Sequence, residues 1–214
     1  MRSWASDTLL GTSRRQLAVR IVLAVGLLGA VLWALPTRRA GEEEGHHGEH
    51  APPLDTFEQA GVTELTEGQR GPVFTLQTLD GRTVTLEEHA GAVVILNFWA
   101  TWCQPCTVEM PALEALWREY RERGLVVLGV SEDRGAPRAL IEPYVRNLGL
   151  TFPILLDPDV ATGQAWRVTA LPATFLIRPG GEVAAMALGA REWNSAPMRA
   201  LIETLLPGHA RHGR

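Results

Sequence analysis

Two cysteines separated by two residues are the strongest chemical signal in this chain of 214 residues. They stand in the stretch Cys103-Gln-Pro-Cys106, and the chain holds 2 cysteines in all. A structural disulfide usually joins distant segments, and one that closes so short a loop removes little entropy from the unfolded chain. The pair is therefore interpreted as a redox-active dithiol that cycles with its disulfide.

The position of the pair predicts different roles for the two thiols. A buried strand is expected to end near Trp99, and Met110 and Leu113 begin a helical apolar pattern after the cysteines. A helix N-terminus presents unpaired N–H groups and a partial positive charge, which lower the pKa of a thiol from about 8.5. Cys103 is expected at the exposed start of this helix as the attacking thiolate. Cys106, nearly one turn further in, is expected to resolve the mixed disulfide.

Metal binding is the main alternative use of two cysteines. A structural zinc site normally needs four ligands, and the sequence offers neither a second cysteine pair nor a histidine pair at suitable spacing. Copper(I) binding by extracytoplasmic thiols is a more serious alternative. It would draw on His89 in the turn before the predicted strand, or on His209 and His212 in the C-terminal tail. The leading interpretation has no metal and no cofactor beyond the disulfide itself.

Apolar patterning predicts an α/β fold with a mixed sheet. Alternation on both sides of Asp80-Gly81 indicates a hairpin, and a continuous apolar run before the cysteines indicates a strand buried on both faces. Strand–helix alternation followed by a hairpin and a last helix is typical of such folds. The predicted strands are residues 73–76, 83–86, 92–99, 125–130, 152–156, 173–177 and 182–188. Helices are predicted from the cysteines to Gly124, over 137–148 and 159–166, and from a Ser195 cap to Leu206.

Charge divides the chain into three parts. Residues 1–40 hold six Arg and one Asp, residues 41–67 hold eight acidic residues without Arg, and residues 68–214 hold fourteen Arg and fifteen acidic residues. All 20 basic residues are Arg, so lysine-based chemistry is excluded. Because the third part is almost neutral, its charge gives no reason to expect nucleic acid as a partner.

The N-terminal part predicts a membrane anchor. Residues 17–35 are apolar except for Arg20, which lies near one end and can reach the interface. Arg14 and Arg15 precede this segment, so residues 1–16 are expected in the cytoplasm. The expected location is the cytoplasmic (inner) membrane, crossed once, with the catalytic domain facing the periplasm or cell exterior. A cleaved secretory signal is the alternative.

An acidic linker is predicted between the anchor and the domain. Residues 36–67 contain Gly, Glu, His and Pro and show little apolar periodicity, which is typical of a flexible tether. His46, His47 and His50 in this stretch are either a weak metal site or solvated linker. The folded domain is predicted over residues 68–207, followed by a disordered tail over 208–214.

Two motifs together resemble the thioredoxin superfamily. These are Asn97-Phe-Trp-Ala-Thr-Trp-Cys-Gln-Pro-Cys106 and Leu171-Pro-Ala-Thr-Phe-Leu-Ile177, and they are most similar to the extracytoplasmic TlpA/ResA-like branch. The resemblance covers about residues 68–207. It implies a thioredoxin fold with an N-terminal β-hairpin and a central helical insert, and a cis-Pro172 loop that faces the disulfide. By analogy, the Leu171 backbone pairs with the substrate chain, and Trp102 and Pro105 join the substrate-binding surface.

Asn97 and Glu109 separate this sequence from cytosolic thioredoxins. Asn97 stands where those proteins carry a buried Asp, and an amide cannot exchange a proton. Glu109 matches an active-site acid of the ResA-like branch, three residues after Cys106. If it is shielded from water, its raised pKa would suit proton exchange with the departing thiol. The alternative is an exposed glutamate on the helix surface.

The resemblance implies a reductant of extracytoplasmic protein disulfides. It suggests apocytochrome c or copper-centre assembly factors as substrates, and a membrane thiol carrier as electron donor. Ala173 stands where the dedicated cytochrome-maturation type usually carries an acidic residue. The alternatives are a copper(I) carrier and a peroxiredoxin-like peroxidase. The peroxidase would use Thr101 before Cys103, but the proline expected before a peroxidatic cysteine has no match.

Overall fold

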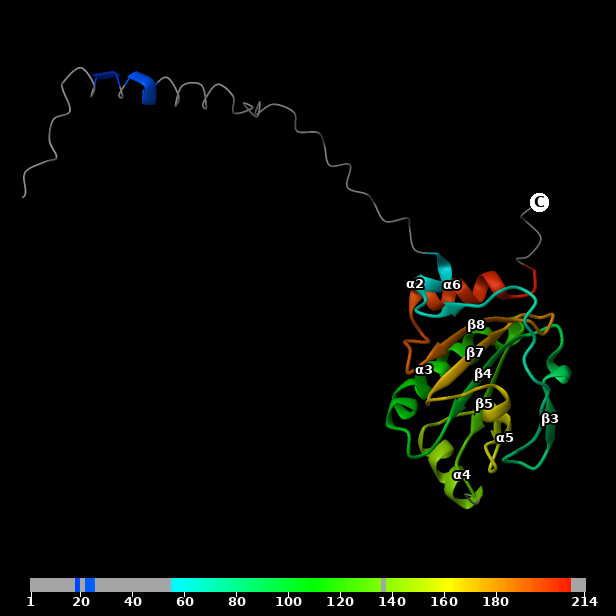
Figure 1. The fold of residues 1–214 in the computed structure, drawn as a ribbon. Helices are drawn as coiled ribbons and strands as arrows, with labels where there is room; N and C mark the ends of the chain where they lie inside the picture. The colour runs from blue at the N-terminus through cyan, green and yellow to red at the C-terminus, as the bar shows by residue number, and fades with distance from the viewer. Residues whose placement is uncertain (1–17, 20–21, 26–54, 136–137, 209–214) are drawn as a thin grey trace, which may run out of the picture. The chain divides into compact units, whose positions relative to one another are not determined.

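The computed structural model describes residues 18–19, 22–25, 55–135 and 138–208 (Figure 1). Met1–His50 and Ala51–Arg214 form two separate units. In the first unit the described residues are helical and exposed. Across the described ranges, no helix combines the length and the apolar character needed to cross a bilayer. Several predictions fall wholly or mostly outside these ranges: the cytoplasmic segment 1–16, the anchor 17–35, the histidines His46, His47 and His50, and most of the tail 208–214.

The second unit is built on one sheet. Its described residues give eight strands in the order β1-β8-β7-β4-β5-β6-β2-β3. Strand β4 pairs in parallel with β5 and antiparallel with β7, so the sheet is mixed. The predicted mixed α/β fold is therefore confirmed. The strands are β1 (Thr63–Glu64), β2 (Thr75–Thr78), β3 (Thr83–Thr85), β4 (Val93–Trp99), β5 (Leu125–Ser131), β6 (Ile154–Leu156), β7 (Ala173–Ile177) and β8 (Val183–Leu188).

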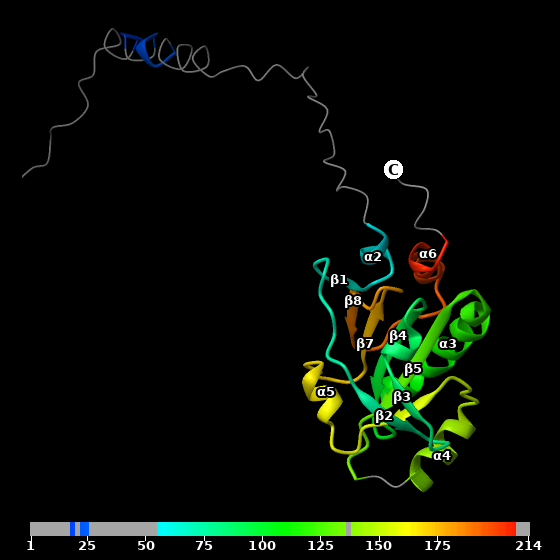
Figure 2. The same ribbon diagram turned by 90° about the vertical axis from the view of Figure 1, so that its right-hand side faces the viewer.

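Helices cover both faces of the sheet. They are α2 (Thr56–Gln59), α3 (Gln104–Tyr120), α4 (Arg138–Asn147), α5 (Ala161–Ala165) and α6 (Ala196–Leu205), with short 3-10 turns η1 (Glu87–His89) and η2 (Arg121–Arg123). Figure 2 shows α3 and α5 on opposite sides of the sheet. Alternation along β4 explains this arrangement: Ile95 packs in the cluster with α3 and α6, whereas Leu96 packs in the cluster with Trp166 beside α5.

Helix α3 begins at the cysteine pair, as the sequence predicts. Cys103 is its N-cap, and Pro105 lies in the first turn, where a missing N–H costs nothing. The helix passes into η2 and ends at Gly124, whose φ of 97° is a left-handed conformation that glycine adopts without steric cost. The following strand β5 returns beside β4 in parallel, which places α3 over the centre of the sheet.

The folded unit begins before the predicted boundary at residue 68. Helix α2 and strand β1 lie within the stretch predicted as flexible linker, and β1 pairs with the edge strand β8 through Thr63 and Met186. Ala60 and Val62 are buried in the core cluster that contains α3 and α6. The linker prediction is therefore wrong for this segment. Its helix has 4 residues and its strand 2 residues, too few to produce a readable period.

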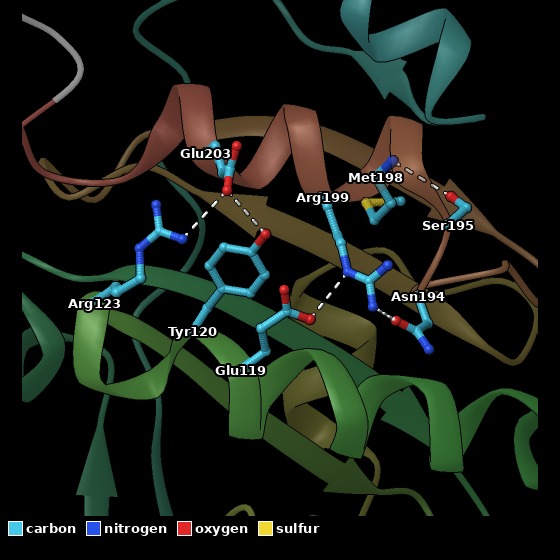
Figure 3. Close-up of polar contacts among 8 residues, drawn as sticks. All are labelled: Glu119, Tyr120, Arg123, Asn194, Ser195, Met198, Arg199 and Glu203. Carbon is cyan, nitrogen blue, oxygen red and sulfur yellow. Dashed lines mark hydrogen bonds and ion pairs between the residues drawn. The ribbon is translucent and has the colours of Figure 1, made fainter.

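Polar contacts fix α6 against α3, as Figure 3 shows. The Nε of Arg199 lies 3.0 Å from Oε2 of Glu119 on α3. Glu203 accepts hydrogen bonds from the Tyr120 hydroxyl at 3.1 Å and from Nη1 of Arg123 at 3.2 Å. Pairs of this kind at the surface contribute little stability individually. Together with the buried face of α6 they fix how this helix lies on α3.

Candidate active site

The cysteine pair lies where β4 ends and α3 begins. Cys103 and Cys106 form a disulfide, and the Cys103 sulfur accepts a hydrogen bond from the backbone N–H of Cys106 at 3.3 Å. Cys103 is 5% exposed and Cys106 is 0% exposed. The expectation of an exposed Cys103 is therefore wrong in degree, because its side chain joins the core cluster in this disulfide form. Cys103 is still the more exposed residue of the pair.

The start of α3 favours a thiolate at Cys103. Its first turn contains no acidic residue, and its 17 residues give a full helix dipole at this end. When the disulfide is reduced, the Cys106 N–H that now bonds the Cys103 sulfur is available to a sulfur that carries a negative charge. Such a charge-assisted hydrogen bond is stronger than one to a neutral thiol. The arrangement therefore stabilises a negative charge on the Cys103 sulfur.

Asp133 holds the turn in front of Cys103, and sequence reasoning did not identify it. Its Oδ1 accepts from the Thr101 hydroxyl at 2.6 Å and from the Thr101 N–H at 3.1 Å. Its Oδ2 accepts from the Ser131 hydroxyl at 2.7 Å. Asp133 follows β5, which neighbours β4 in the sheet. It therefore fixes the segment that leads into the cysteine pair.

Glu109 is buried, so the alternative of an exposed helix glutamate is wrong. Its side chain is 2% exposed and lies one helical turn beyond Cys106, on the same side of α3. Its Oε1 accepts from Nδ2 of Asn97 at 2.9 Å. Its Oε2 accepts from the backbone N–H of Arg191 at 3.0 Å and from Nε1 of Trp193 at 2.9 Å. Three donors thus converge on a carboxylate that water does not reach.

Strand register brings Asn97 to Glu109. Asn97 pairs with Thr174 across β4 and β7, and both side chains point to the α3 face of the sheet. The Nδ2 of Asn97 donates to the Thr174 hydroxyl at 2.8 Å as well as to Glu109. Its Oδ1 is buried without a hydrogen-bond partner in the described part of the chain. The Oδ1 of Asn97 can therefore accept a further hydrogen bond close to the Glu109 carboxyl.

Burial is the dominant influence on the proton affinity of Glu109. It raises the pKa of this carboxyl above the ordinary value of 4.5, because the charged form loses its hydration. The hydrogen bonds from Trp193, from the Arg191 backbone and from Asn97 act in the opposite direction and lower the pKa. The net shift is upward, which is the direction that proton exchange with a thiol requires.

Trp193 is a second site residue that sequence reasoning did not identify. It is 0% exposed, and its indole N–H is used by Glu109, 84 residues away. A buried indole N–H usually has a partner, but the sequence gives no sign of which one. The sole local signal is the neighbouring Ser195 cap, which places Trp193 just before α6.

Trp102 and Pro105, two of the predicted substrate-binding residues, are exposed neighbours of the cysteines in the chain. Trp102 is 71% exposed and lines a cavity of about 760 Å³ together with Leu171 and Glu132. Leu171 also packs against the cluster that contains both cysteines. Pro105 is exposed in the first turn of α3. A substrate chain therefore has an open surface beside Cys103.

The loop before β7 has the conformation that the resemblance implied. The Leu171–Pro172 peptide bond is cis, and Pro172 is buried. Its carbonyl accepts a hydrogen bond from the N–H of Gly189 at 2.8 Å. This bond links the loop to the segment that carries Arg191 and Trp193. The cis-proline loop is thus joined by a hydrogen bond to the segment that holds Glu109.

The histidines named for copper are not placed with the cysteines. His89 lies in η1 before β4, whereas Cys103 follows that strand; seven extended residues span roughly 20 Å. His209 and His212 lie outside the described residues. Where the structure describes the chain, no three His, Cys, Asp or Glu side chains are grouped to hold a metal ion.

The sequence is similar to those of known thiol–disulfide oxidoreductases. The model of the AhpC/TSA family matches residues 68–186. Thiol-disulfide oxidoreductase ResA of Geobacillus thermodenitrificans is 40% identical over 121 residues, covering 56% of this chain and 68% of that protein. ResA of Bacillus subtilis is 33% identical over 130 residues, covering 61% and 72%.

A solved structure shows the same fold. It is a Chlorobium tepidum protein assigned as thiol:disulfide interchange protein DsbE, 28% identical with a TM-score of 0.60, covering 66% of this chain and 98% of that one. Proteins of this kind work through a redox-active cysteine pair. Residues 68–186, which the family model matches, include both cysteines, Glu109 and the cis-proline loop. The chain therefore belongs to the AhpC/TSA family, with a thioredoxin-like fold, and is a thiol–disulfide oxidoreductase related to ResA.

Proposed function

We propose that this protein is a membrane-anchored reductant of disulfides in extracytoplasmic proteins. The Cys103 thiolate attacks a substrate disulfide and forms a mixed disulfide, releasing one substrate thiolate. Cys106 then attacks the Cys103 sulfur, releases the second substrate thiolate and leaves the enzyme as the Cys103–Cys106 disulfide. Two electrons pass to the substrate in each cycle, and a membrane thiol carrier is the proposed donor that restores the dithiol.

The observation that carries this proposal is the asymmetry of the pair. Cys103 caps α3 and accepts the Cys106 N–H, while Cys106 has no exposed surface. A substrate can reach one sulfur, and the other is reserved for the internal attack. Glu109, one turn further along the helix, is the proposed proton-exchange group for the Cys106 thiol, because it is buried and its pKa is raised.

Location and substrates are extensions of this proposal. The apolar segment 17–35 with Arg14 and Arg15 before it supports an anchor with the domain outside the cytoplasm. ResA relatives support protein thiols or disulfides as substrates. We propose oxidised apocytochrome c or copper-centre assembly factors as the substrates. The exposed Trp102 next to Cys103 supplies an apolar contact for such a chain.

A trapping experiment tests the proposal. Cys106→Ser should accumulate a mixed disulfide with an oxidised Cys-x-x-Cys-His peptide, because the internal attack is lost. The matched variant Cys103→Ser should trap almost none, because the Cys106 sulfur is buried. Equal trapping by the two variants, or none by either, would contradict the proposed order of attack. The same preparations are assayed for peroxide consumption and for copper(I) binding that resists a chelator, which identify the two alternative functions.

A further inference from the structure

The carboxylate of Glu109 is held mainly by one loop, between β8 and α6. Residues 189–195, here called the acid-holding loop, supply two of its three hydrogen-bond donors. These are the backbone N–H of Arg191 and the indole N–H of Trp193, and both bind Oε2. Since Oε1 is left to Asn97, the loop determines where the second carboxylate oxygen lies.

The acid-holding loop is itself fixed at both ends. Toward α6, Ser195 caps the helix by accepting the Met198 N–H at 3.3 Å, and Arg199 binds Asn194 as well as Glu119 (Figure 3). Toward β8, the N–H of Gly189 donates to the Pro172 carbonyl at 2.8 Å. The loop is thus tied to α3 through α6 and to the cis-proline loop.

A third connection leads to the N-terminal segment of the folded unit. The Arg191 side chain donates from its Nε to the Gly61 carbonyl at 2.6 Å, and its positive charge also lowers the pKa of Glu109. Its Nη1 donates to the carbonyls of Gly189 and Ala190 at 3.2 and 3.0 Å. Gly61 lies between α2 and β1, within the stretch 36–67 that the sequence predicts as linker. One residue therefore binds the acid through its backbone and this segment through its side chain.

We propose that Trp193 is a positioning residue of the redox site, which holds Glu109 in place for proton exchange, and that Arg191 secures the loop by binding Gly61. This inference rests on the proposed role of Glu109. The indole N–H of Trp193 binds the Glu109 carboxylate, so its effect on the thiols is expected to pass through that carboxylate. A donor to the ionised form favours that form, so losing the indole N–H makes Glu109 hold its proton to higher pH. Removing the Arg191 side chain acts in the same direction and more weakly, because the bond to Gly61 and a positive charge that lowers the pKa of Glu109 are lost but the backbone N–H remains.

Trp193→Phe tests the inference, with Trp166→Phe as its matched control. Trp166 is also buried, and its indole N–H has no partner in the described part of the chain. It packs on the opposite face of the sheet, with Phe98 and Phe175. Both variants lose the same atoms from a buried site. Only Trp193→Phe removes a hydrogen bond to Glu109.

The readout is the titration of the Glu109 carboxyl in the reduced full-length protein. Infrared absorption of the protonated carboxyl is followed with pH and assigned by its loss in Glu109→Gln. Trp193→Phe should raise the midpoint by about one pH unit, the effect of one charge-assisted hydrogen bond, and Arg191→Ala by less. Trp166→Phe should leave the midpoint unchanged. Equal midpoints for Trp193→Phe and Trp166→Phe would overturn the inference, as would no shift in Arg191→Ala if Trp193→Phe fails to fold.

The thiols supply a second readout that a merely structural effect would not reproduce. Thiolate absorbance of the reduced protein is measured against pH in single and double variants. Trp193→Phe should alter this curve in the native background and leave it unaltered in the Glu109→Gln background. Equal effects in both backgrounds would contradict action through Glu109. If Glu109→Gln alone leaves the curve unchanged, the proposed proton role of Glu109 fails, while the infrared titration still decides the positioning role of Trp193.

Discussion

Glu132 is a buried acid whose ionisation should reduce the stability of the folded protein. It follows β5, is 8% exposed, and its Oε1 has no hydrogen-bond partner in the described part of the chain. Burial, and then the charge of Asp157, raise the pKa of Glu132 from 4.5 to about 7, while Arg134 lowers it. The folded state therefore binds this proton more tightly than the unfolded state. The resulting stabilisation is complete below about pH 4.5 and is lost as the pH rises through about 7.

The size of this effect follows from the shift. A rise from 4.5 to about 7 corresponds to a free-energy difference of at most about 3 kcal/mol, at about 1.4 kcal/mol per unit, and solvent screening at the cavity that Glu132 lines reduces it. Glu132→Gln cannot ionise, so its free energy of unfolding should match the native protein near pH 4 and exceed it by up to about 3 kcal/mol near pH 9. Urea unfolding of the disulfide form, followed by tryptophan fluorescence from pH 4 to 9, measures the difference.

The comparison between variant and native protein isolates Glu132. The raised pKa of Glu109 has the same sign, but it contributes to both proteins and cancels in the difference. Glu87→Gln, at an exposed position in η1, is the matched control and should leave the pH profile unchanged. Parallel profiles for Glu132→Gln and the native protein across this range would refute the reasoning, because they would show that Glu132 ionises without cost.

Two further changes test the packing that positions the site. Gly129→Ala in β5 should lower the free energy of unfolding by about 1–3 kcal/mol. The new Cβ would lie 2.9 Å from Cδ1 of Ile154 and 3.0 Å from Cε2 of Phe152. An unchanged midpoint of urea unfolding would count against this crowding. Ser195→Ala removes the cap on the Met198 N–H and should cost about 1 kcal/mol. Thermal unfolding measures that loss, and Ser195→Asp, which restores a cap, should recover it.

The central part of the fold could be predicted because its signals are local and strong. Strand β4 is buried at all 7 positions, and its apolar run shows this directly. Helix α3 has a clear apolar period, a proline in its first turn and Gly124 just past its end. The cis bond before Pro172 came from the resemblance, since the energetic preference of an X–Pro bond cannot be read from its neighbours.

The features that escaped prediction depend on distant contacts. Trp193 meets Glu109 across 84 positions, and Arg191 meets Gly61 across 130. No periodicity of either segment encodes these pairs. Asp133 holds Thr101 through neighbouring strand ends, 32 positions apart. Glu109 also takes two of its contacts from the acid-holding loop, through Arg191 and Trp193. Its position on the helix alone therefore left both a buried acid and an exposed glutamate open.

The short N-terminal elements were missed for a different reason. Helix α2 and strand β1 take their order from what they pack on, because β1 adds to the exposed edge of β8 and Val62 enters the core. Their composition is polar and acidic and, taken alone, resembles a tether. Tertiary context here overrides local propensity, and it places Gly61 next to the loop that holds Glu109.

The reduction potential of the Cys103–Cys106 couple tests the proposed direction of electron flow most directly. The full-length protein is equilibrated in thiol–disulfide buffers, and tryptophan fluorescence reports the oxidised fraction. If the protein passes electrons to substrate disulfides, the Cys103–Cys106 couple should be reversible, involve two electrons and have a potential near or below about −220 mV. A potential near about −120 mV, typical of an oxidant that installs disulfides, or no reversible couple at all, would contradict it.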